Sequence, residues 1–518
     1  MRLFILCFLF LLFLAPSVPA YAACASPAGV AGDLIWNETA KRPAYCDGTN
    51  WRNFLKKNSS RITTELMSGG AFHTCGLKPN GEAYCWGANA QGATGQGTTS
   101  GNQTTPTRVG TETGWSVISG GGWIDDIFMN NPISYSCGIR SGALYCWGRN
   151  YLGQTGLGTT SGSQLTPAQV GSFTDWETVS AGYYVACGIR SGALYCWGQN
   201  GTGATGLGTS SGSQLTPAQV GSFTDWTSVS VVTGGVIGPY ACGIRAGSLY
   251  CWGNNMSGRT GLGTSSGTQL TPAQVGSFTD WEMVTAGGAA ACAIRSGALY
   301  CWGENTQGAT GLGTTSGVQL TPAQVGSYTD WSIVSGAGSA TCGIRGGALY
   351  CWGAGGYTGL GTTTGTQTTP AQVGVETDWS FVGSGDFSHC GIRGSALYCW
   401  GSNGSGATGL GTTSGIQTTP GLVDANWGSF GSFGGSGGGS GACTAPDGVS
   451  GQIIYNSTHH VLQYCDGVAW HGAGPILDST GPGCTGPTGV EGEIIFNSTY
   501  STLQYCNGTA WRGVAMIN

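Results

Sequence analysis

The stretch Cys137-Gly-Ile-Arg-Ser-Gly-Ala-Leu-Tyr-Cys146-Trp-Gly148 contains two short apolar runs on either side of Ser141-Gly142. A two-residue turn at this dipeptide would pair the runs as a β-hairpin. Counting outward from the turn, Cys137 falls opposite Cys146 at a non-hydrogen-bonded pair, where side chains approach most closely. The stretch therefore predicts an antiparallel hairpin closed by a cross-strand disulfide.

The tripeptide Cys-Trp-Gly recurs along the chain, beginning at positions 85, 146, 196, 251, 301, 351 and 399. Before each copy lies a strand-like segment that leads into the hairpin, and after it come a Gly/Thr-rich loop and a further strand-like segment containing Pro. About four short strands per unit, repeated around a ring, are typical of a β-propeller blade, and a closed ring removes exposed sheet edges. We therefore expect an all-β fold, a seven-bladed β-propeller at residues 61–433, closed by its chain ends.

Composition also favours strands and turns. Glycine supplies 98 of the 518 residues, whereas Asp, Glu, Lys and Arg together supply only 8%. Exposed helices need charged residues on their outer face, so this composition excludes a helical bundle. Apolar residues make up 40% of the chain and include 19 Trp, which excludes a disordered protein. With a formal net charge of −6 and only 18 Lys and Arg, we expect no nucleic-acid partner.

The cysteines fall into pairs. Seven pairs lie in the predicted hairpins: Cys75/Cys85, Cys137/Cys146, Cys187/Cys196, Cys242/Cys251, Cys292/Cys301, Cys342/Cys351 and Cys390/Cys399. Three further pairs are each 22 positions apart: Cys24/Cys46, Cys443/Cys465 and Cys484/Cys506. Zinc is the alternative for paired cysteines, but only His73 and His389 lie near any hairpin pair. We expect ten disulfides and no metal site.

The first 22 residues are organised like an export signal. Arg2 precedes an apolar run from Leu3 to Leu14, and Ala20-Tyr21-Ala22 resembles a cleavage site. We therefore expect a secreted protein, located outside the cell, in the periplasm or at the cell surface. No later stretch reaches the roughly 20 apolar residues of a membrane span, so we expect none. Lipid attachment at Cys24 is an alternative that would leave Cys46 without a partner.

Three small modules flank the expected ring, at residues 23–56, 443–475 and 484–518. In each module the first Cys is followed 13 positions later by Asn, 22 later by Cys and 27 later by Trp. A module of about 30 residues is too small for a hydrophobic core, which explains a disulfide. A Gly/Ser linker at residues 434–442 precedes the second module and should be flexible.

Motifs for catalysis and cofactors are weak. Residues 201–206 and 404–409 match G-x-G-x-x-G, but the dinucleotide fingerprint requires a parallel strand before it and a helix after it. We interpret these glycines as turn residues and expect no cofactor. His73 and His389 have no acid and nucleophile placed to complete a triad, so we interpret them as packing residues and expect no enzyme.

The repeat resembles a known family. Trp-x-x-Val-x-x-Gly, His73-Thr74-Cys75, Tyr-Cys-Trp-Gly-x-Asn-x-x-Gly-x-Thr-Gly-Leu-Gly and Pro-x-x-Val resemble the regulator of chromosome condensation repeat over about 70% of the chain. The resemblance implies a ring of seven blades. It also implies relatives that include a nuclear exchange factor for a small GTPase, a plant ultraviolet photoreceptor and an exported inhibitor of β-lactamases. Export and ten disulfides agree with the inhibitor and disagree with guanine-nucleotide exchange.

Two copies depart from the repeat, and such departures are where functional loops are expected. The distance from the first-strand Trp to the following Cys is 11 positions in blades 3, 5, 6 and 7, but 22 in blade 2 and 16 in blade 4. The first and third connections of an antiparallel blade emerge on one face, so the insertions should lie beside the loops after Cys-Trp-Gly. The expected binding residues of blades 2 to 4 are Trp123, Asp125, Asp126, Phe128, Met129, Arg149, Tyr151, Tyr183, Tyr184, Tyr240, Met256 and Arg259.

Aromatic residues, Met and Arg are enriched in protein-binding hot spots, so we expect these residues to bind another protein. The alternative that the insertion only packs over the mouth of the ring stays open. A second hypothesis is polysaccharide binding, with Trp123, Tyr151, Tyr183 and Tyr184 stacking on sugar rings. A third, enzymatic activity, would depend on Asp125 and Asp126 alone, and adjacent carboxylates are weak grounds for it.

Overall fold

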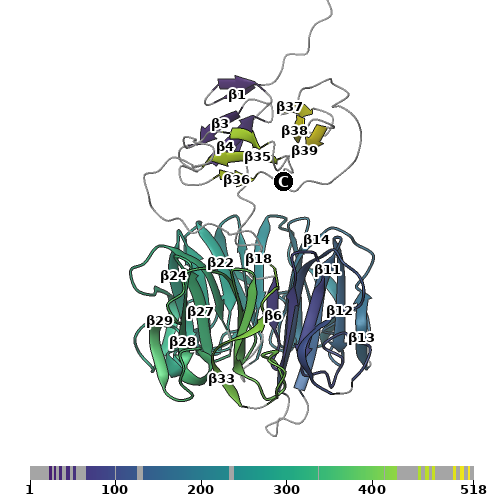
Figure 1. The fold of residues 1–518 in the computed structure, drawn as a ribbon, viewed down its shortest axis with the longest axis vertical. Coiled ribbons are helices and arrows are strands. Elements are labelled where there is room, and N and C mark those ends of the chain that lie inside the picture. Colours follow the sequence, from purple (N-terminus) through teal and green to yellow (C-terminus); the bar gives the residue numbers. More distant parts are fainter. Residues whose placement is uncertain are drawn as a thin grey trace, which may run out of the picture. The chain divides into compact units, whose positions relative to one another are not determined.

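The Cys-Trp-Gly repeats fold into seven four-stranded antiparallel sheets arranged in a ring, as the computed structural model of the chain shows (Figure 1). The structure describes residues 66–428 apart from 100, 125–131, 161, 233–237, 337 and 414. It also describes the backbone of short strands within residues 23–53 and 453–513. The expectation of an all-β, seven-bladed propeller is confirmed.

Each blade is one continuous run of four strands, and each strand pairs with the next one along the chain. The strands of blades 1 to 3 are β6 (Met67–Gly69), β7 (His73–Leu77), β8 (Ala83–Gly87), β9 (Gln103–Arg108), β10 (Trp115–Ile124), β11 (Pro132–Arg140), β12 (Ala143–Arg149), β13 (Ser163–Gln169), β14 (Trp176–Ala181), β15 (Val185–Arg190), β16 (Ala193–Gln199) and β17 (Ser213–Gln219).

Blades 4 to 7 follow the same plan and add three short 3-10 turns. Their elements are β18 (Trp226–Val231), β19 (Tyr240–Arg245), β20 (Ser248–Asn254), η1 (Met256–Gly258), β21 (Thr268–Gln274), β22 (Trp281–Ala286), β23 (Ala290–Arg295), β24 (Ala298–Glu304), η2 (Thr306–Gly308), β25 (Val318–Gln324), β26 (Trp331–Gly336), β27 (Ala340–Arg345), β28 (Ala348–Ala354), η3 (Gly355–Tyr357), β29 (Thr366–Gln372), β30 (Trp379–Ser384), β31 (Ser388–Arg393), β32 (Ala396–Ser402) and β33 (Ile416–Asp424).

The hairpin register agrees with the sequence. Cys137 pairs with Cys146 and Arg140 with Ala143, so the turn lies at Ser141-Gly142. Both turn residues have positive φ, 49° and 77°, as a two-residue hairpin turn requires. All seven blade pairs of cysteines form disulfides, each with Cα atoms 4.1 Å apart. The other three predicted disulfides lie outside the described side chains.

The small modules contain three-stranded antiparallel sheets. These are β3 (Leu34–Asn37), β4 (Arg42–Cys46) and β5 (Trp51–Asn53) in the first module, β34 (Ile453–Asn456), β35 (Val461–Cys465) and β36 (Trp470–Gly472) in the second, and β37 (Ile494–Asn497), β38 (Thr502–Cys506) and β39 (Trp511–Gly513) in the third. The first module also has β1 (Ala23–Ala25) paired with β2 (Ala28–Val30). The shared sequence pattern thus corresponds to a shared strand order.

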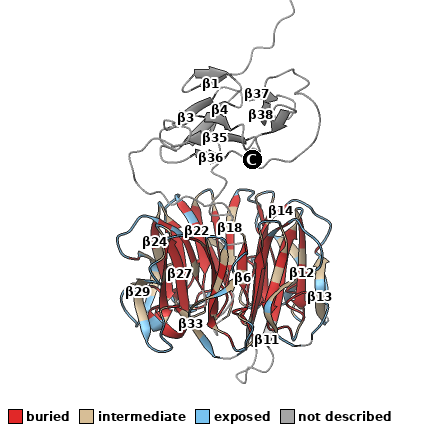
Figure 2. Cartoon of the chain, viewed as in Figure 1, coloured by how far each residue is buried: buried red, intermediate tan, exposed pale blue. Residues whose placement is uncertain are grey.

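Buried side chains fill the sheets of the ring, and exposed residues gather in loops and outer strands (Figure 2). The hydrophobic clusters extend from one blade into the next. Cys137 and Cys146 of blade 2, for example, share a cluster with Trp176 and Trp197 of blade 3. The core therefore lies largely between adjacent blades.

The tryptophan of Cys-Trp-Gly links each blade to the one before it. All seven of these side chains have 0% exposure. In six of them the indole Nε1 donates to a backbone carbonyl in the loop after the third strand of the preceding blade, over 2.8–3.0 Å: Trp86 to Ala407, Trp147 to Ala93, Trp197 to Gln154, Trp252 to Ala204, Trp302 to Arg259 and Trp352 to Ala309. We call these contacts the indole links.

The loop that accepts each indole link is held by the Asn of Cys-Trp-Gly-x-Asn. In blade 5, Asn305 Nδ2 donates to the carbonyl of Thr314 over 3.0 Å, and Thr310 Oγ1 donates to Asn305 Oδ1 over 2.5 Å. These bonds fix the segment that carries the Ala309 carbonyl, the acceptor for Trp352. In blade 6 this loop is two residues shorter, and Nε1 of Trp400 has no hydrogen-bond partner within the described residues.

The ring closes through Trp427, which follows the last strand of blade 7. Its side chain is 1% exposed and packs against Tyr84 and Trp86 of blade 1, with ring centroids 5.5 and 6.0 Å away. Its Nε1 donates to the carbonyl of Leu77 over 2.9 Å. Trp427 therefore fills the place that a first-strand Trp fills in every other blade, and the chain ends meet through this side chain while each blade keeps its own four strands.

Trp427→Ala should destabilise the whole ring because it leaves a cavity at the closing interface. A buried Trp replaced by Ala costs about 3–5 kcal/mol in free energy of unfolding, which chemical denaturation monitored by circular dichroism would measure. Tyr151→Ala, at a half-exposed side chain, is the control and should change the free energy by less than about 0.5 kcal/mol. Equal stabilities of the two variants would contradict closure through Trp427.

Candidate interaction surface

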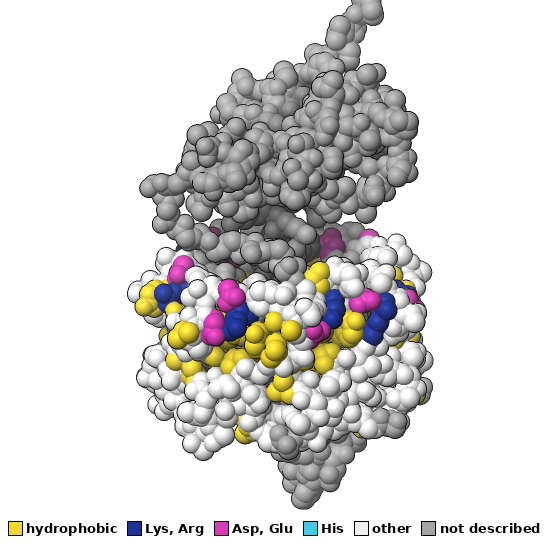
Figure 3. Space-filling model, in the orientation of Figure 1, with side chains coloured by type: hydrophobic (Ala, Val, Ile, Leu, Met, Phe, Trp, Pro, Cys, Tyr) yellow, Lys and Arg dark blue, Asp and Glu magenta, His cyan; other side chains and the backbone are white. Residues whose placement is uncertain are grey.

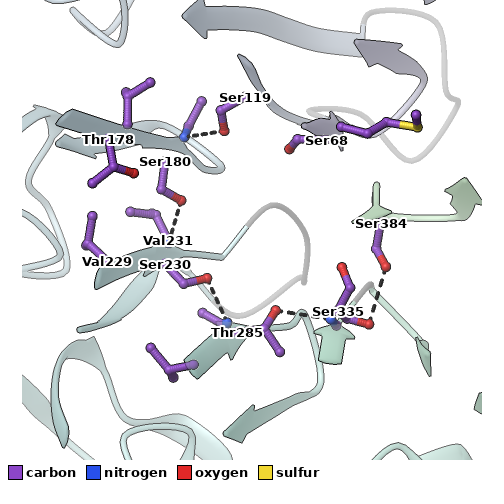
Figure 4. Close-up of a pocket in the computed structure, with 16 residues that line it drawn as sticks. Ser68, Ser119, Thr178, Ser180, Val229, Ser230, Val231, Thr285, Ser335 and Ser384 are labelled. Carbon is purple, nitrogen blue, oxygen red and sulfur yellow. Dashed lines mark hydrogen bonds between the residues drawn. The ribbon is translucent and has the colours of Figure 1, made fainter. Parts of the chain in front are cut away.

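A ring of hydroxyl groups surrounds the central channel of the propeller. The innermost strand of each blade contributes one of them: Ser68, Ser119, Ser180, Ser230, Thr285, Ser335 and Ser384 (Figure 4). Five of these oxygens accept a backbone N–H from the next blade, with Ser180 bound to Val231 N over 2.9 Å as an example. Ser384 instead donates to the carbonyl of Ser335 over 3.3 Å.

The channel cavity has a volume of about 60 Å³. Ligand pockets for small organic molecules are several times larger, at roughly 300–1,000 Å³. The hydroxyls therefore serve to join the blades, and the cavity between them has room for little more than water. A surface at one end of the ring is the better candidate.

The blade 2 insertion lengthens the first two strands, which corrects the expectation that all of it is a loop. Strands β10 and β11 have 10 and 9 residues, against 6 in the corresponding strands of blade 3. Trp123 pairs with Ile133 in the backbone of this extended hairpin. The side chain of Trp123 lies outside the described atoms, and Asp125, Asp126, Phe128 and Met129 lie outside the described residues.

The first connections of blades 2, 3 and 4 lie side by side. Gly122 N donates to the carbonyl of Gly182 over 3.0 Å, and Tyr183 N donates to the carbonyl of Val232 over 2.8 Å. The third connection of blade 3 reaches the same place, because Thr202 Oγ1 donates to the carbonyl of Pro239 over 3.3 Å. The structure thus brings the backbone of the two departing blades together at one end of the ring, which we call the insertion end.

Several predicted site residues are accessible at the insertion end. Tyr151 and Met256 are each 50% exposed, and the Arg149 guanidinium lies 4.7 Å from the centroid of the Tyr151 ring. Tyr183 is partly buried and packs against Tyr184, with ring centroids 4.1 Å apart. Tyr184 is buried, so it packs beneath the more exposed Tyr183 ring and contributes little surface for a partner to contact.

Tyr240 and Arg259 have structural places that the sequence did not indicate. Tyr240 is fully buried, and its hydroxyl donates to the carbonyl of Gly287 in blade 5 over 2.8 Å. Arg259 is 1% exposed, its guanidinium lies 3.5 Å from Glu304, and its carbonyl accepts an indole link. Neither side chain is presented to solvent, because both lie between blades 4 and 5.

The two blade histidines are packing residues, as interpreted from the sequence. His73 Nε2 lies 2.9 Å from Ser136 Oγ, and His389 Nδ1 lies 2.8 Å from Ser384 Oγ. Desolvation by burial lowers the pKa of His73 to about 4 and that of His389 to about 3. Both rings are therefore neutral near pH 7 and serve the blades.

Asp386 is a buried acid in the first connection of blade 7. Its side chain is 1% exposed, and neither carboxyl oxygen has a hydrogen-bond partner within the described residues. Its backbone nevertheless joins three blades, because its N–H donates to Gly70 and its carbonyl accepts from Gly338. Burial raises the pKa of the Asp386 carboxyl well above its ordinary value.

The repeated Arg and Asp residues form ion pairs at the opposite end of the blades. In blades 3 to 7 the Arg at the end of the second strand contacts the Asp before the first-strand Trp: Arg190–Asp175, Arg245–Asp225, Arg295–Asp280, Arg345–Asp330 and Arg393–Asp378. Exposed aromatic side chains accompany four of these pairs, and the sequence analysis missed them. The fourfold Phe-Thr-Asp-Trp or Tyr-Thr-Asp-Trp is the signal that would have identified them.

Other kinds of site have no support in the described part of the chain. No three His, Cys, Asp or Glu side chains come together there as metal ligands would. Among those same residues, no helix has the length and apolar character needed to cross a membrane. The G-x-G-x-x-G loop at residues 201–206 runs through turns, with positive φ at Gly203 and Gly206.

The repeats match a known family. The family model of the Regulator of chromosome condensation (RCC1) repeat matches residues 141–189 and 246–294, and a second model of the same repeat matches residues 66–93. Both longer matches run from one hairpin turn to the second strand of the next blade, across an interface between blades. The chain therefore carries RCC1 repeats in a seven-bladed ring.

Solved structures share this fold at low sequence identity. Human WBSCR16 is 18% identical with a TM-score of 0.55, over 66% of this chain and 93% of that one. Prp20p from Saccharomyces cerevisiae, studied for its binding to Gsp1p and histones, is 15% identical with a TM-score of 0.57, over 71% of this chain and 89% of that one. Yeast RCC1 (Prp20) bound to Kap60 is 16% identical with a TM-score of 0.55, over 70% of this chain and 85% of that one. These likenesses establish the fold alone.

Asp386→Asn should stabilise the ring by an amount that grows with pH. The folded-state pKa is raised above the ordinary value of 3.8, so the wild type loses stability as pH rises through this range, whereas the neutral amide does not. The gain should approach about 1.4 kcal/mol for each pH unit between 3.8 and the folded-state pKa. Thermal unfolding at a series of pH values measures it.

Glu376→Gln provides the control for this experiment. Backbone hydrogen bonds from its own N–H and that of Val375, together with Arg393, lower the pKa of Glu376. Its ionised form therefore stabilises the fold, and the variant should lose a small amount of stability as pH rises. A pH-independent gain for Asp386→Asn would show that the Asp386 carboxyl is not ionising against its burial.

Proposed function

We propose that the chain is an exported protein-binding β-propeller that engages another protein through its insertion end over blades 2 to 4. The observation that carries the proposal is the break in repetition at this end. Blades 3, 5, 6 and 7 have short first connections, whereas blades 2 and 4 have longer ones whose backbones meet through blade 3. A surface of the ring that binds a partner accounts for such a local departure from an otherwise regular repeat.

The chemistry of the accessible residues supports a protein partner. Tyr151 and Met256 are half exposed, and Arg149 lies against the Tyr151 ring, where it is held in place for contact. Aromatic residues, Met and Arg are the types that concentrate binding energy in protein interfaces. A ring of buried sheets also holds these side chains in place before binding, which reduces the entropy lost on association.

Disulfides support the proposed location. All seven blade disulfides are formed and their cysteines are buried, and such bonds persist in oxidising compartments outside the cytosol. The apolar segment at the start of the chain supplies a route of export. The same considerations speak against nuclear guanine-nucleotide exchange. In this proposal the small modules serve as attachments or spacers.

The decisive experiment replaces three side chains of the insertion end with the residues that other blades have at the same positions. In a triple variant, Arg149→Gln and Tyr151→Gly copy the matching residues of blade 3, Gln199 and Gly201, and Met256→Thr copies Thr306 of blade 5. Each substitute is already accepted by a blade, so the fold should be retained. Cross-linking of wild type and variant in the protein's native surroundings, followed by mass spectrometry, should show at least one partner lost from the variant.

A matched variant at the other end of the ring, Phe223→Val, is the control and should keep that partner. Circular dichroism should be identical for the three proteins. Recovery of the same partners by wild type and by the triple variant would contradict the proposal, as would recovery of none by the wild type.

A further inference from the structure

Four exposed aromatic side chains repeat along the end of the ring opposite the insertion end. Phe173, Phe223, Phe278 and Tyr328 each lie in the connection that enters the first strand of blades 3, 4, 5 and 6, three residues before its Trp. Their exposed fractions are nearly equal, at 50%, 50%, 47% and 53%. We call these positions the aromatic stations.

Each aromatic ring is held by an arginine. The guanidinium carbon lies 3.3–3.5 Å from the ring centroid in all four stations, in the pairs Arg190/Phe173, Arg245/Phe223, Arg295/Phe278 and Arg345/Tyr328. A guanidinium stacked at this distance covers one face of the ring. Since half of each side chain remains exposed, the other face is open to solvent.

Each arginine is neutralised by an aspartate at the same station. Arg245 Nε contacts Asp225 Oδ1 over 2.5 Å, and Arg345 Nε contacts Asp330 Oδ1 over 2.8 Å. At two stations a serine hydroxyl, that of Ser191 or Ser296, also donates to the carboxylate. The aspartates remain partly exposed, so each station offers an apolar platform beside oxygen acceptors and carries no net charge.

The stations form one edge of the ring. Figure 3 shows acidic, basic and hydrophobic side chains in a band along the visible side of the ring. The other two blades that have a first-strand Trp break the series, because Glu112 stands at the matching position of blade 2 and Glu376 at that of blade 7. In blade 2 Glu112 pairs with Arg140, and in blade 7 Glu376 pairs with Arg393. The platform is thus confined to four consecutive blades.

The four aromatic stations are alike, have paired charges and lie one in each blade. They therefore suit a partner built from repeating chemical units. A polyanion or polycation would gain nothing from stations whose charges are already paired. A single folded protein concentrates its binding energy in one central cluster of unlike residues, and four like stations do not resemble that arrangement. A neutral polysaccharide presents the apolar face and the hydroxyls of each sugar ring many times over, which fits an aromatic platform flanked by carboxylates.

We propose that the aromatic stations of blades 3 to 6 bind a neutral polysaccharide. Each station binds weakly on its own, and a long chain that reaches several of them binds tightly through effective concentration. This site is separate from the insertion end, so the protein would hold a polymer with one end of the ring and a protein partner with the other.

The test uses the full chain and a panel of neutral polysaccharides: cellulose, a β-1,3-glucan, starch and mannan. Affinity electrophoresis or retention on the insoluble polymers measures binding. At least one polymer should retain the wild type, and its single sugar should not compete. A quadruple variant, Phe173→Val, Phe223→Val, Phe278→Val and Tyr328→Val, should lose about tenfold or more in affinity. The fold should tolerate valine, because about half of each of these aromatic side chains is exposed to solvent.

A gain of binding separates recognition from a merely structural role. Glu376 stands at the aromatic position in blade 7 and pairs with Arg393, which also contacts Asp378. Glu376→Phe should therefore create a fifth station and raise the affinity for the same polymer. Val318→Thr is the matched control and should leave retention unchanged, because it changes an exposed apolar residue of the outer strand β25 to the residue that blade 4 has there, Thr268. The proposal is overturned if no polymer retains the wild type, if the folded quadruple variant binds as well as the wild type, or if Glu376→Phe gives no gain.

Discussion

The hydrogen bond from a buried indole to the loop of the preceding blade is the contact on which the ring depends. This hydrogen bond joins the two parts that define the repeat. The donor is the Trp of Cys-Trp-Gly in one blade, and the acceptor is in the loop after the Asn of Cys-Trp-Gly-x-Asn in the preceding blade. In blades 5 and 6 this means that Asn305 fixes the loop whose Ala309 carbonyl receives Trp352. Because the donor and acceptor lie in different blades, neither blade satisfies the bond alone.

Other interblade contacts reinforce the indole links at different radii of the ring. Hydroxyls such as Ser180 bind the next blade around the central channel, and the blade disulfides are buried in the clusters between sheets. Trp427 packs against Trp86 of blade 1 and takes the place of the first-strand Trp that blade 1 lacks. A closed ring of this kind leaves loops free to vary at one end, which is where blades 2 and 4 depart from the repeat.

Much of this architecture could be predicted because it repeats. The register of Cys137 and Cys146 follows from counting outward from a turn, and the seven copies of Cys-Trp-Gly give the number of blades. Loops were harder to predict. Tyr240 and Arg259 look like surface residues in the sequence, but their burial depends on how blades 4 and 5 pack, which no local pattern reveals. Strand β10 likewise extends as far as Trp123 because β11 pairs with it there, with Ile133 opposite Trp123.

The aromatic stations were overlooked for the opposite reason. Phe173 and its counterparts recur so regularly that they resemble structural residues, and only their exposure in the folded ring distinguishes them from the buried Trp three positions later. Regularity in a repeat thus has two physical origins. Buried repeated residues satisfy the interface between blades, whereas exposed repeated residues need another explanation, and a repeating ligand supplies one.

The ring is thus a single cooperative unit in which each blade is held by both neighbours. Hydrogen exchange measured by mass spectrometry, blade by blade and under mildly destabilising conditions, tests this most directly. Amides of the second and third strands of all seven blades should exchange at one common rate, set by opening of the whole ring. Separate rates, with blades opening one after another from either end of the chain, would contradict it.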